Sequence, residues 1–207
     1  MLPSPVLAHF RQYDQVLFEV LQDRELGMVK PQPVTDPEEY FARLCDDIIS
    51  QQLANAAAKT IFGRFTELFP DGIVSAEKLL ELPDTDLRSA GLSGAKAKSV
   101  KDLARHVREN LLSFQLFPDM NDETLITELI KVRGIGRWTA EMFLLFTMGR
   151  DDIFSFGDLG LRRGFAKLYG FQDDDNLDKQ MKKTTALWSP YRSYGSLALW
   201  RHYDRTK

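Results

Sequence analysis

The sequence contains one cysteine, three histidines and no long apolar run. A lone cysteine, Cys45, excludes a disulfide within the chain and a four-cysteine zinc or iron–sulfur site. The histidines His9, His106 and His202 show no ligand spacing, so neither a metal centre nor another cofactor is predicted. Because the chain also lacks 18 consecutive apolar residues and a secretory signal, we expect an intracellular protein that does not span a membrane.

Apolar residues are nevertheless frequent enough to build a folded core. The 207 residues are 43% hydrophobic and 28% charged, which is typical of a globular protein. A chain of this length fits one domain or two small lobes. Cys45 lies in the apolar stretch "FARLCDDII", which predicts a buried structural thiol.

Charge is unevenly distributed along the chain. The formal net charge is −3, yet residues 131–207 carry 14 Lys and Arg against 9 Asp and Glu, whereas residues 1–130 carry 13 against 21. A basic C-terminal third permits a nucleic-acid partner, but an ordinary solvated surface explains the same asymmetry.

Apolar residues recur at three- and four-residue spacing throughout the chain, and no segment alternates as a strand would. Helix-start signals support this periodicity; Asp36 and Pro37, for example, precede two acidic residues. The predicted fold class is therefore all-α. Helical patterns are found in residues 35–69 with a break near 51–55, and in 75–83, 84–92, 93–110, 121–132, 137–149, 158–170, 176–188 and 189–205.

Two glycines flank one isoleucine directly before a helix, in "KVRGIGRWTAEMFLLF" at residues 131–146. Glycine allows sharp turns and close approach of the backbone to another molecule, because it lacks a Cβ atom. The first amides of the following helix have no intrahelical partner and can bind an anion such as a phosphate. Taken alone, such a turn is often only a connection between two helices.

Longer stretches around this turn carry a family resemblance. "LIKVRGIGRWTAEMFLLF" and, after a loop, "DIFSFGDLGLRRGF" closely resemble the helix-hairpin-helix DNA glycosylases, in particular the 3-methyladenine DNA glycosylase II branch. "CDDIISQQLANAAAKTIFGRF" and "WSPYRSYGSLALW" add to a similarity that covers roughly residues 38–203. The resemblance implies an all-helical fold of two lobes with the active-site cleft between them. It also implies that residues 1–207 form a single domain of two helical subdomains, without the N-terminal β domain of longer relatives.

The resemblance also implies how the hairpin would bind double-stranded DNA. Backbone amides of the turn would contact a phosphate without reading sequence, and nearby arginines would add electrostatic attraction. Carbonyl groups of the turn would hold a monovalent cation. The implied DNA-binding residues are Arg133, Gly134, Gly136, Arg137 and Thr139, and the implied cation ligands are the carbonyls of Ile130, Val132 and Ile135.

Asp158 is the candidate catalytic residue. It stands where a helix is expected to begin, and acidic residues at that position usually act as helix caps. The two roles are compatible, because amide dipoles at a helix N-terminus favour an ionised carboxylate. Members of the family cleave an N-glycosidic bond, so a fixed negative charge would stabilise the positive charge that develops on the sugar. Asp158 could equally orient or deprotonate the attacking water.

Trp138 stands where family members that also cut the DNA strand carry a lysine that forms a Schiff base. Its identity implies a monofunctional enzyme, and an indole ring suits a base made cationic by alkylation. A tryptophan buried in the core is the alternative interpretation. Met142 replaces a tyrosine and Tyr191 a tryptophan of well-known bacterial relatives, so the aromatic content of the expected base pocket is altered.

Gln51 and Gln52 occupy the expected break between two helices. At this position the family inserts a side chain, here called the wedge, into the gap left by a flipped base. Gln52 matches the wedge position best. Gly94, Lys96 and Ser99 are weaker candidates for a second contact with the DNA backbone.

The sequence therefore predicts a monomeric DNA glycosylase that hydrolyses alkylated purines such as 3-methyladenine and 7-methylguanine from double-stranded DNA. Three alternatives stay open: a non-catalytic helix-hairpin-helix DNA-binding module, a glycosylase of the same fold that acts on a mismatched or oxidised base, and a structural helical protein with an accidental match. The missing lysine and cysteine cluster count against the lyase and iron–sulfur versions of the second.

Overall fold

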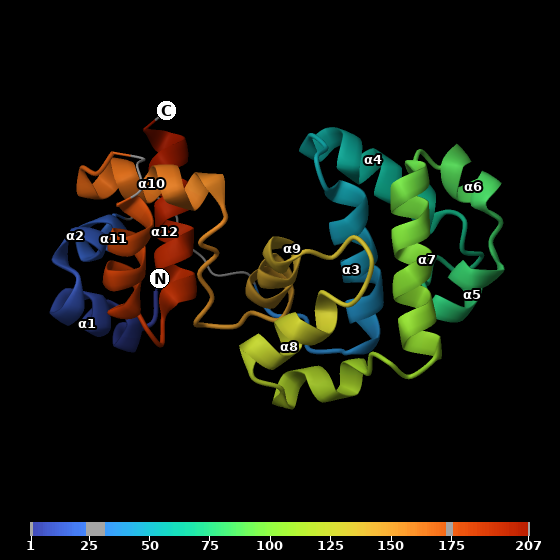
Figure 1. Cartoon of the computed structure of the whole chain (residues 1–207), viewed down its shortest axis with the longest axis horizontal. Helices are drawn as coiled ribbons and strands as arrows, with labels where there is room; N and C mark the ends of the chain where they lie inside the picture. The colour runs from blue at the N-terminus through green and yellow to red at the C-terminus, as the bar shows by residue number, and fades with distance from the viewer. Residues whose placement is uncertain (1, 24–31, 173–175, 207) are drawn as a thin grey trace. The chain divides into compact units, whose positions relative to one another are not determined.

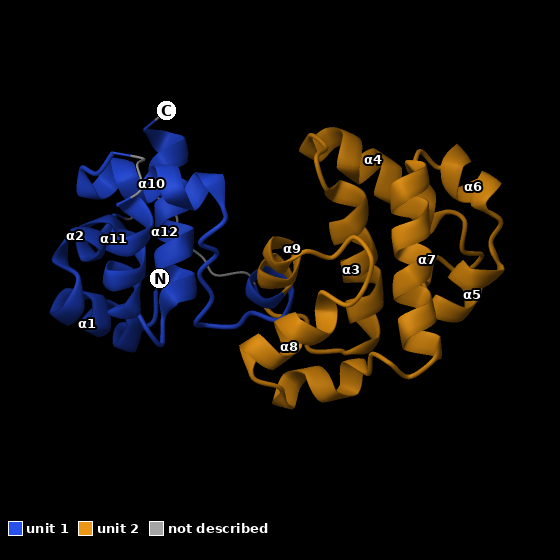
Figure 2. Cartoon of the chain, in the orientation of Figure 1, with its two compact units in different colours: residues 1–32, 144–207 blue, residues 33–143 orange. Residues whose placement is uncertain are grey.

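The chain folds into helices joined by loops (Figure 1). The computed structural model describes residues 2–23, 32–172 and 176–206, and within them no strand is present. The predicted all-α class is thereby confirmed. Two compact units are formed, unit 1 by residues 1–32 and 144–207 and unit 2 by residues 33–143 (Figure 2). None of the helices in the described ranges is long and apolar enough to cross a membrane.

Unit 2 contains the helices of the middle of the chain. They are α3 (Glu38–Ser50), α4 (Asn55–Thr66), α5 (Ala76–Glu81), α6 (Asp84–Ser89), α7 (Gly94–Arg108), the 3-10 helix η2 (Phe114–Asp119), α8 (Asp122–Leu129) and α9 (Arg137–Met142). Helix α9 continues into a π-helical turn, Phe143–Thr147, that leads into unit 1. The predicted helix over residues 35–69 is broken at 51–54, close to the expected position.

Short polar side chains begin several helices of unit 2. Ser75, Ser93 and Asn121 each accept a hydrogen bond from the backbone amide three residues later, which satisfies one of the unpaired amides of the first turn. The core consists of buried apolar side chains from all the helices of unit 2. Cys45 is fully buried among them, as predicted.

Unit 1 combines the two ends of the chain. Its helices are α1 (Ser4–Tyr13), α2 (Gln15–Gln22), α10 (Leu159–Tyr169), α11 (Leu177–Ala186) and α12 (Arg192–Arg205). Its centre is the fully buried Trp188, whose indole nitrogen donates to Asp14 Oδ2 at 2.7 Å. Tyr169 donates its hydroxyl to the same oxygen at 2.6 Å, so the buried carboxylate of Asp14 joins three parts of the sequence.

Helix α12 lies close to Trp188 because Gly195 has no side chain. A Cβ atom at this position would stand 2.4 Å from Cε3 of the indole ring. Replacing Gly195 by alanine is therefore expected to lower the free energy of unfolding by about 1–3 kcal/mol, the usual cost of overpacking a core. Urea denaturation followed by tryptophan fluorescence measures the change.

Gly63 in α4 is the matched control, because a Cβ atom there meets nothing within 4 Å. Gly63→Ala is expected to raise stability by up to about 1 kcal/mol, since alanine favours a helix more than glycine does. Equal effects of the two substitutions would contradict the proposed steric origin.

Candidate functional site

The hairpin between α8 and α9 contains both glycines of the Gly-Ile-Gly turn. Gly134 has a φ of +84°, and a Cβ atom on it would lie 2.4 Å from Oγ of Ser99. Conformation and packing both require glycine at this position. Gly136 has a φ of −90° and precedes α9, and a Cβ atom on it would meet nothing within 4 Å. The backbone at Gly134 is thus packed against Ser99, whereas the space on the Cβ side of Gly136 is empty.

One face of α7 supports the hairpin and the turn after α3. Ser99 is 5% exposed, and its hydroxyl donates to Ala95 O at 3.0 Å beneath Gly134. Three residues later, Asp102 Oδ2 accepts a hydrogen bond from the Arg133 amide at 2.9 Å. The burial of Ser99 favours a packing role over the predicted contact with the DNA backbone.

Lys96, on the same face of α7, is bound to the end of α3. Its ammonium group donates to the carbonyls of Ile49 and Gln51, each at 2.7 Å. A cation suits this position because the last carbonyls of a helix carry partial negative charge. Burial lowers the pKa of Lys96 below its ordinary value. Gly94 is exposed in the first turn of α7, behind the cap residue Ser93.

The two glutamines after α3 differ in their surroundings. Gln51 donates its side-chain amide to Gly134 O at 2.9 Å and to Thr139 Oγ1 at 3.1 Å, so it connects the turn after α3 to the hairpin. Gln52 is exposed and has a φ of +59°, a conformation that a non-glycine residue rarely adopts. The arrangement leaves Gln52 as the better candidate for the wedge.

A buried acid lies one helical turn before Gln51. Oδ2 of Asp47 is buried, and none of the described residues donates a hydrogen bond to it. Burial raises the pKa of the Asp47 carboxyl to about 7, and the charge of Asp46 adds to the increase, which Arg43 only partly offsets.

The two arginines of the hairpin also differ. Arg137 donates from Nε to Glu141 at 2.9 Å and from its two terminal nitrogens to Glu123 at 2.5 and 3.1 Å. The hydrogen bond to Glu123 is the main cause that raises the pKa of Arg137. Arg133 is exposed as Arg137 is, but its side chain forms no ion pair with the described residues. Much of the positive charge predicted for this turn is therefore neutralised within the protein.

Asp158 caps the N-terminus of α10, as the sequence indicated. Its Oδ1 atom accepts hydrogen bonds from the Leu161 amide and from Nε1 of Trp200 on α12, both at 2.8 Å. Phe146 stacks on the Trp200 ring with a centroid distance of 5.7 Å. The carboxylate is partly buried, and the neighbouring Leu159 is 62% exposed. Two N–H donors suit an ionised carboxylate, which only accepts hydrogen bonds.

The predicted base-pocket residues belong to both units. In unit 2, Trp138 is 46% exposed, which excludes the alternative of a tryptophan buried in the core, whereas Met142 is buried. In unit 1, Tyr191 precedes α12 and packs its ring against His9 and Tyr194. Each unit thus supplies an aromatic candidate.

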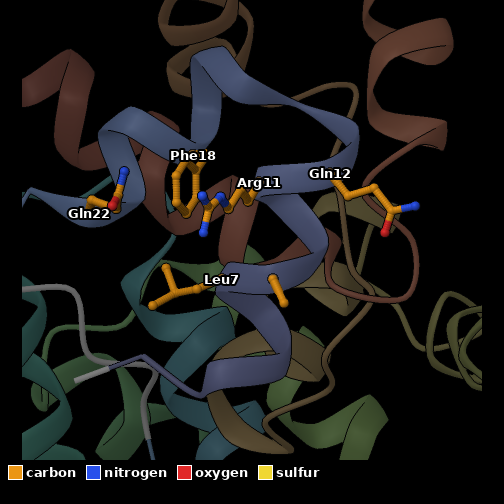
Figure 3. A pocket seen from close by; sticks show the side chains of 6 residues that line it. Leu7, Arg11, Gln12, Phe18 and Gln22 are labelled. Carbon is orange, nitrogen blue, oxygen red and sulfur yellow. The ribbon is translucent and has the colours of Figure 1, made fainter.

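A hollow between α1 and α2 contains none of these residues. Figure 3 shows Leu7, Arg11, Gln12, Phe18 and Gln22 around it, and Ala8 completes the lining. It offers no carboxylate or nucleophile, and Asp158 is not part of its wall. We therefore do not assign the chemistry to this hollow.

Comparison with known proteins decides the family. Residues 45–190 match the profile of the HhH-GPD superfamily of base excision DNA repair proteins. The chain belongs to this superfamily. Among sequence relatives, a putative DNA-3-methyladenine glycosylase of Bacillus subtilis is 39% identical over 164 residues, which is 76% of this chain and 56% of the relative. The chain thus spans little more than half the length of that relative.

Solved structures of the HhH-GPD superfamily share the fold. A DNA-3-methyladenine glycosidase from Bacillus halodurans is 33% identical with a TM-score of 0.84, covering 97% of this chain and 89% of its own. The 3-methyladenine DNA glycosylase of Schizosaccharomyces pombe, in complex with abasic DNA, is 26% identical with a TM-score of 0.80 and 95% coverage of both chains. The resemblance inferred from the sequence is confirmed.

Several residues around the site were not found from the sequence. They are Asp102, Glu123 and Glu141 around the hairpin, and Phe146, Gly160 and Trp200 around Asp158. Gly160, two residues after Asp158, was the one local sign of these contacts. A glycine near the start of a helix can mark the close approach of another side chain. The others depend on contacts between distant segments.

Gly134→Ala is expected to destabilise the protein by a few kcal/mol, because the new methyl group overlaps Ser99 and φ is positive. Gly136→Ala, two residues later, is the control and is expected to leave the free energy of unfolding nearly unchanged. Urea denaturation of both variants provides the comparison, and equal stabilities would refute the packing described for Gly134.

Asp47→Asn tests the buried carboxyl. The folded pKa of about 7 exceeds the unfolded value, so the native state is favoured at low pH, and that stability is lost as the pH rises through 7. Each pKa unit is worth about 1.4 kcal/mol, so the free energy of unfolding of the wild type should fall by a few kcal/mol between pH 4 and pH 8 because of Asp47. The variant, which lacks this carboxyl, should show no such fall. Denaturation at both pH values measures the difference, and parallel pH profiles would contradict the burial of a charge.

Proposed function

We propose that this protein is a monofunctional DNA glycosylase that hydrolyses the N-glycosidic bond of alkylated purines, such as 3-methyladenine and 7-methylguanine, in double-stranded DNA. The observation that carries the proposal is Asp158, a carboxylate held by two N–H donors at the start of α10. The names of the relatives from Bacillus subtilis, Bacillus halodurans and Schizosaccharomyces pombe support the same activity.

Asp158 acts in this proposal on the sugar of the damaged nucleotide. Loss of the base leaves positive charge on the anomeric carbon and ring oxygen, and a fixed carboxylate stabilises that charge more in the transition state than in the ground state. The same group orients the attacking water or accepts its proton. A purine methylated at N3 or N7 is already cationic and departs as a neutral base, so little acid catalysis is needed.

Trp138 supports both the substrate class and the monofunctional outcome. Its exposed indole offers an electron-rich face on which a cationic purine can stack. Indole cannot form a Schiff base with the sugar, so the product is an abasic site in an uncut strand. Met142 and Tyr191 complete the proposed base pocket.

The hairpin and the turn after α3 are the proposed DNA contacts. The backbone in front of Gly136 is open to a phosphate, Arg133 adds one positive charge, and Gln52 fills the gap left by the flipped base. Carbonyl oxygens suit a monovalent cation in the turn, and the Val132 carbonyl that accepts the Ile135 amide at 3.1 Å keeps a second lone pair. Gly94 and Lys96 are proposed to form a second, weaker contact with the DNA backbone. We further propose that the protein acts as a monomer where genomic DNA is found.

Asp158→Asn tests the proposed reaction. The wild type is expected to release free 3-methyladenine and 7-methylguanine from methylated DNA, and the variant at least about 100-fold more slowly, because a charge that stabilises the transition state is lost. Chromatography of the released bases measures both rates. Binding of DNA with an abasic analogue, followed by fluorescence anisotropy, should be retained by the variant.

The outcomes separate the alternatives. Binding by both proteins without release by either would indicate a non-catalytic DNA-binding module, and release of a different damaged base would change the substrate class. Borohydride should trap no covalent complex, because trapping would indicate a Schiff base and hence a bifunctional enzyme.

A further inference from the structure

We propose that Trp200 is a positioning residue that fixes the orientation of the Asp158 carboxylate for the base-excision reaction. The inference rests on the proposed function and goes beyond it, because Trp200 ends the stretch "WSPYRSYGSLALW" but was given no role there. Nε1 of Trp200 donates to Oδ1 of Asp158 at 2.8 Å.

Two donors on one oxygen define the orientation of the carboxylate. The Leu161 amide belongs to α10, the helix that Asp158 caps, whereas the indole nitrogen belongs to α12. A single hydrogen bond allows a carboxylate to rotate about it. A second donor from a different helix restricts that rotation, and small displacements of a catalytic group reduce rates strongly.

The residues packed around the Trp200 indole hold it against Asp158. A Cβ atom on Gly160 would lie 2.9 Å from Cδ1 and 3.0 Å from Nε1 of Trp200, so glycine is needed for the ring to reach Asp158. On another side, Phe146 stacks on the ring with an interplanar angle of 27°. Phe146 is 41% exposed, so the ring pair continues from Asp158 to the protein surface.

Trp200→Phe removes the N–H donor and keeps a ring for Phe146 to stack on. The expected result is a decrease of about 10- to 100-fold in kcat for base release, because the carboxylate is less well oriented. KM for methylated DNA should change less than twofold, since the DNA contacts are in other segments. Single-turnover and steady-state assays on the full-length protein measure both quantities.

Trp188→Phe is the matched control in the same unit. It removes an equivalent indole–carboxylate hydrogen bond, the one from Trp188 to Asp14 at 2.7 Å, in the core. This variant should have a lower melting temperature but the kcat of the wild type. If both variants lost kcat in proportion to their loss of stability, Trp200 would be a structural residue and the proposal would be overturned.

Gly160→Ala provides a second test that keeps the tryptophan. The added methyl group would crowd Cδ1 and Nε1 of the indole at 2.9 and 3.0 Å and Oδ1 of Asp158 at 3.1 Å, so it disturbs their hydrogen bond from between the two partners. Alanine near the start of α10 favours the helix. We expect a decrease in kcat similar to that of Trp200→Phe and a smaller loss of melting temperature than in Trp188→Phe, because the gain in helix propensity offsets part of the crowding. A fully active Gly160→Ala variant would contradict the positioning role.

Nuclear magnetic resonance tests the contact without the reaction. The chain has three tryptophans, so three indole N–H signals are expected, and Trp200→Phe identifies one of them by its loss. In Asp158→Ala this signal should shift and exchange faster with solvent. An unchanged signal would show that the hydrogen bond is absent in solution and would overturn the proposal.

Failure of this inference is distinguishable from failure of the proposed function. If the wild type released no base from methylated DNA, the proposed function would be overturned and the positioning role with it. If the wild type were active and Trp200→Phe equally active, only the positioning role would be overturned.

Discussion

Unit 2 depends on the close contact between the backbone of Gly134 and the side chain of Ser99. This contact places the hairpin directly on α7, where a methyl group would already be too large. The same helix face holds the Arg133 amide through Asp102 and the end of α3 through Lys96. As a result, α7 holds both the hairpin and the turn that carries Gln52. The side-chain hydrogen bond from Gln51 to Gly134 O connects the two to each other.

In unit 1, too, glycines allow close packing. Glycines allow large groups from elsewhere in the chain to come close: Gly195 accommodates Trp188, and Gly160 accommodates Trp200. Each of these tryptophans then donates its indole N–H to a carboxylate. In the core this pairing satisfies the buried acid Asp14, whereas at the edge of α10 it holds the carboxylate to which we assign catalysis. The difference in exposure between Asp14 and Asp158 separates the two roles.

Features encoded locally were predictable from the sequence. Helical periodicity gave the all-α class, the break after α3 and the cap position of Asp158, because spacing and cap residues act within a few positions. The family resemblance also followed from contiguous motifs. The partners of Lys96, Ser99 and Arg137 did not, since a lysine, a serine and an arginine look alike in sequence whether they face solvent or a buried contact. Their structural contacts reduce the group of residues available for DNA binding, while the wedge and base-pocket assignments stay predictions.

The pairing of Arg137 with Glu123 and Glu141 bears on how the proposed glycosylase would search genomic DNA. Lys131 is likewise paired, with Glu128 at 2.7 Å. The carboxylates of Glu123, Glu128 and Glu141 therefore balance much of the positive charge of the hairpin. Counterions are displaced from DNA only in proportion to the cations that approach its phosphates. In the proposed function, an anchor made mainly of amide dipoles would lose little affinity as ionic strength rises, and it would leave undamaged duplex easily between encounters.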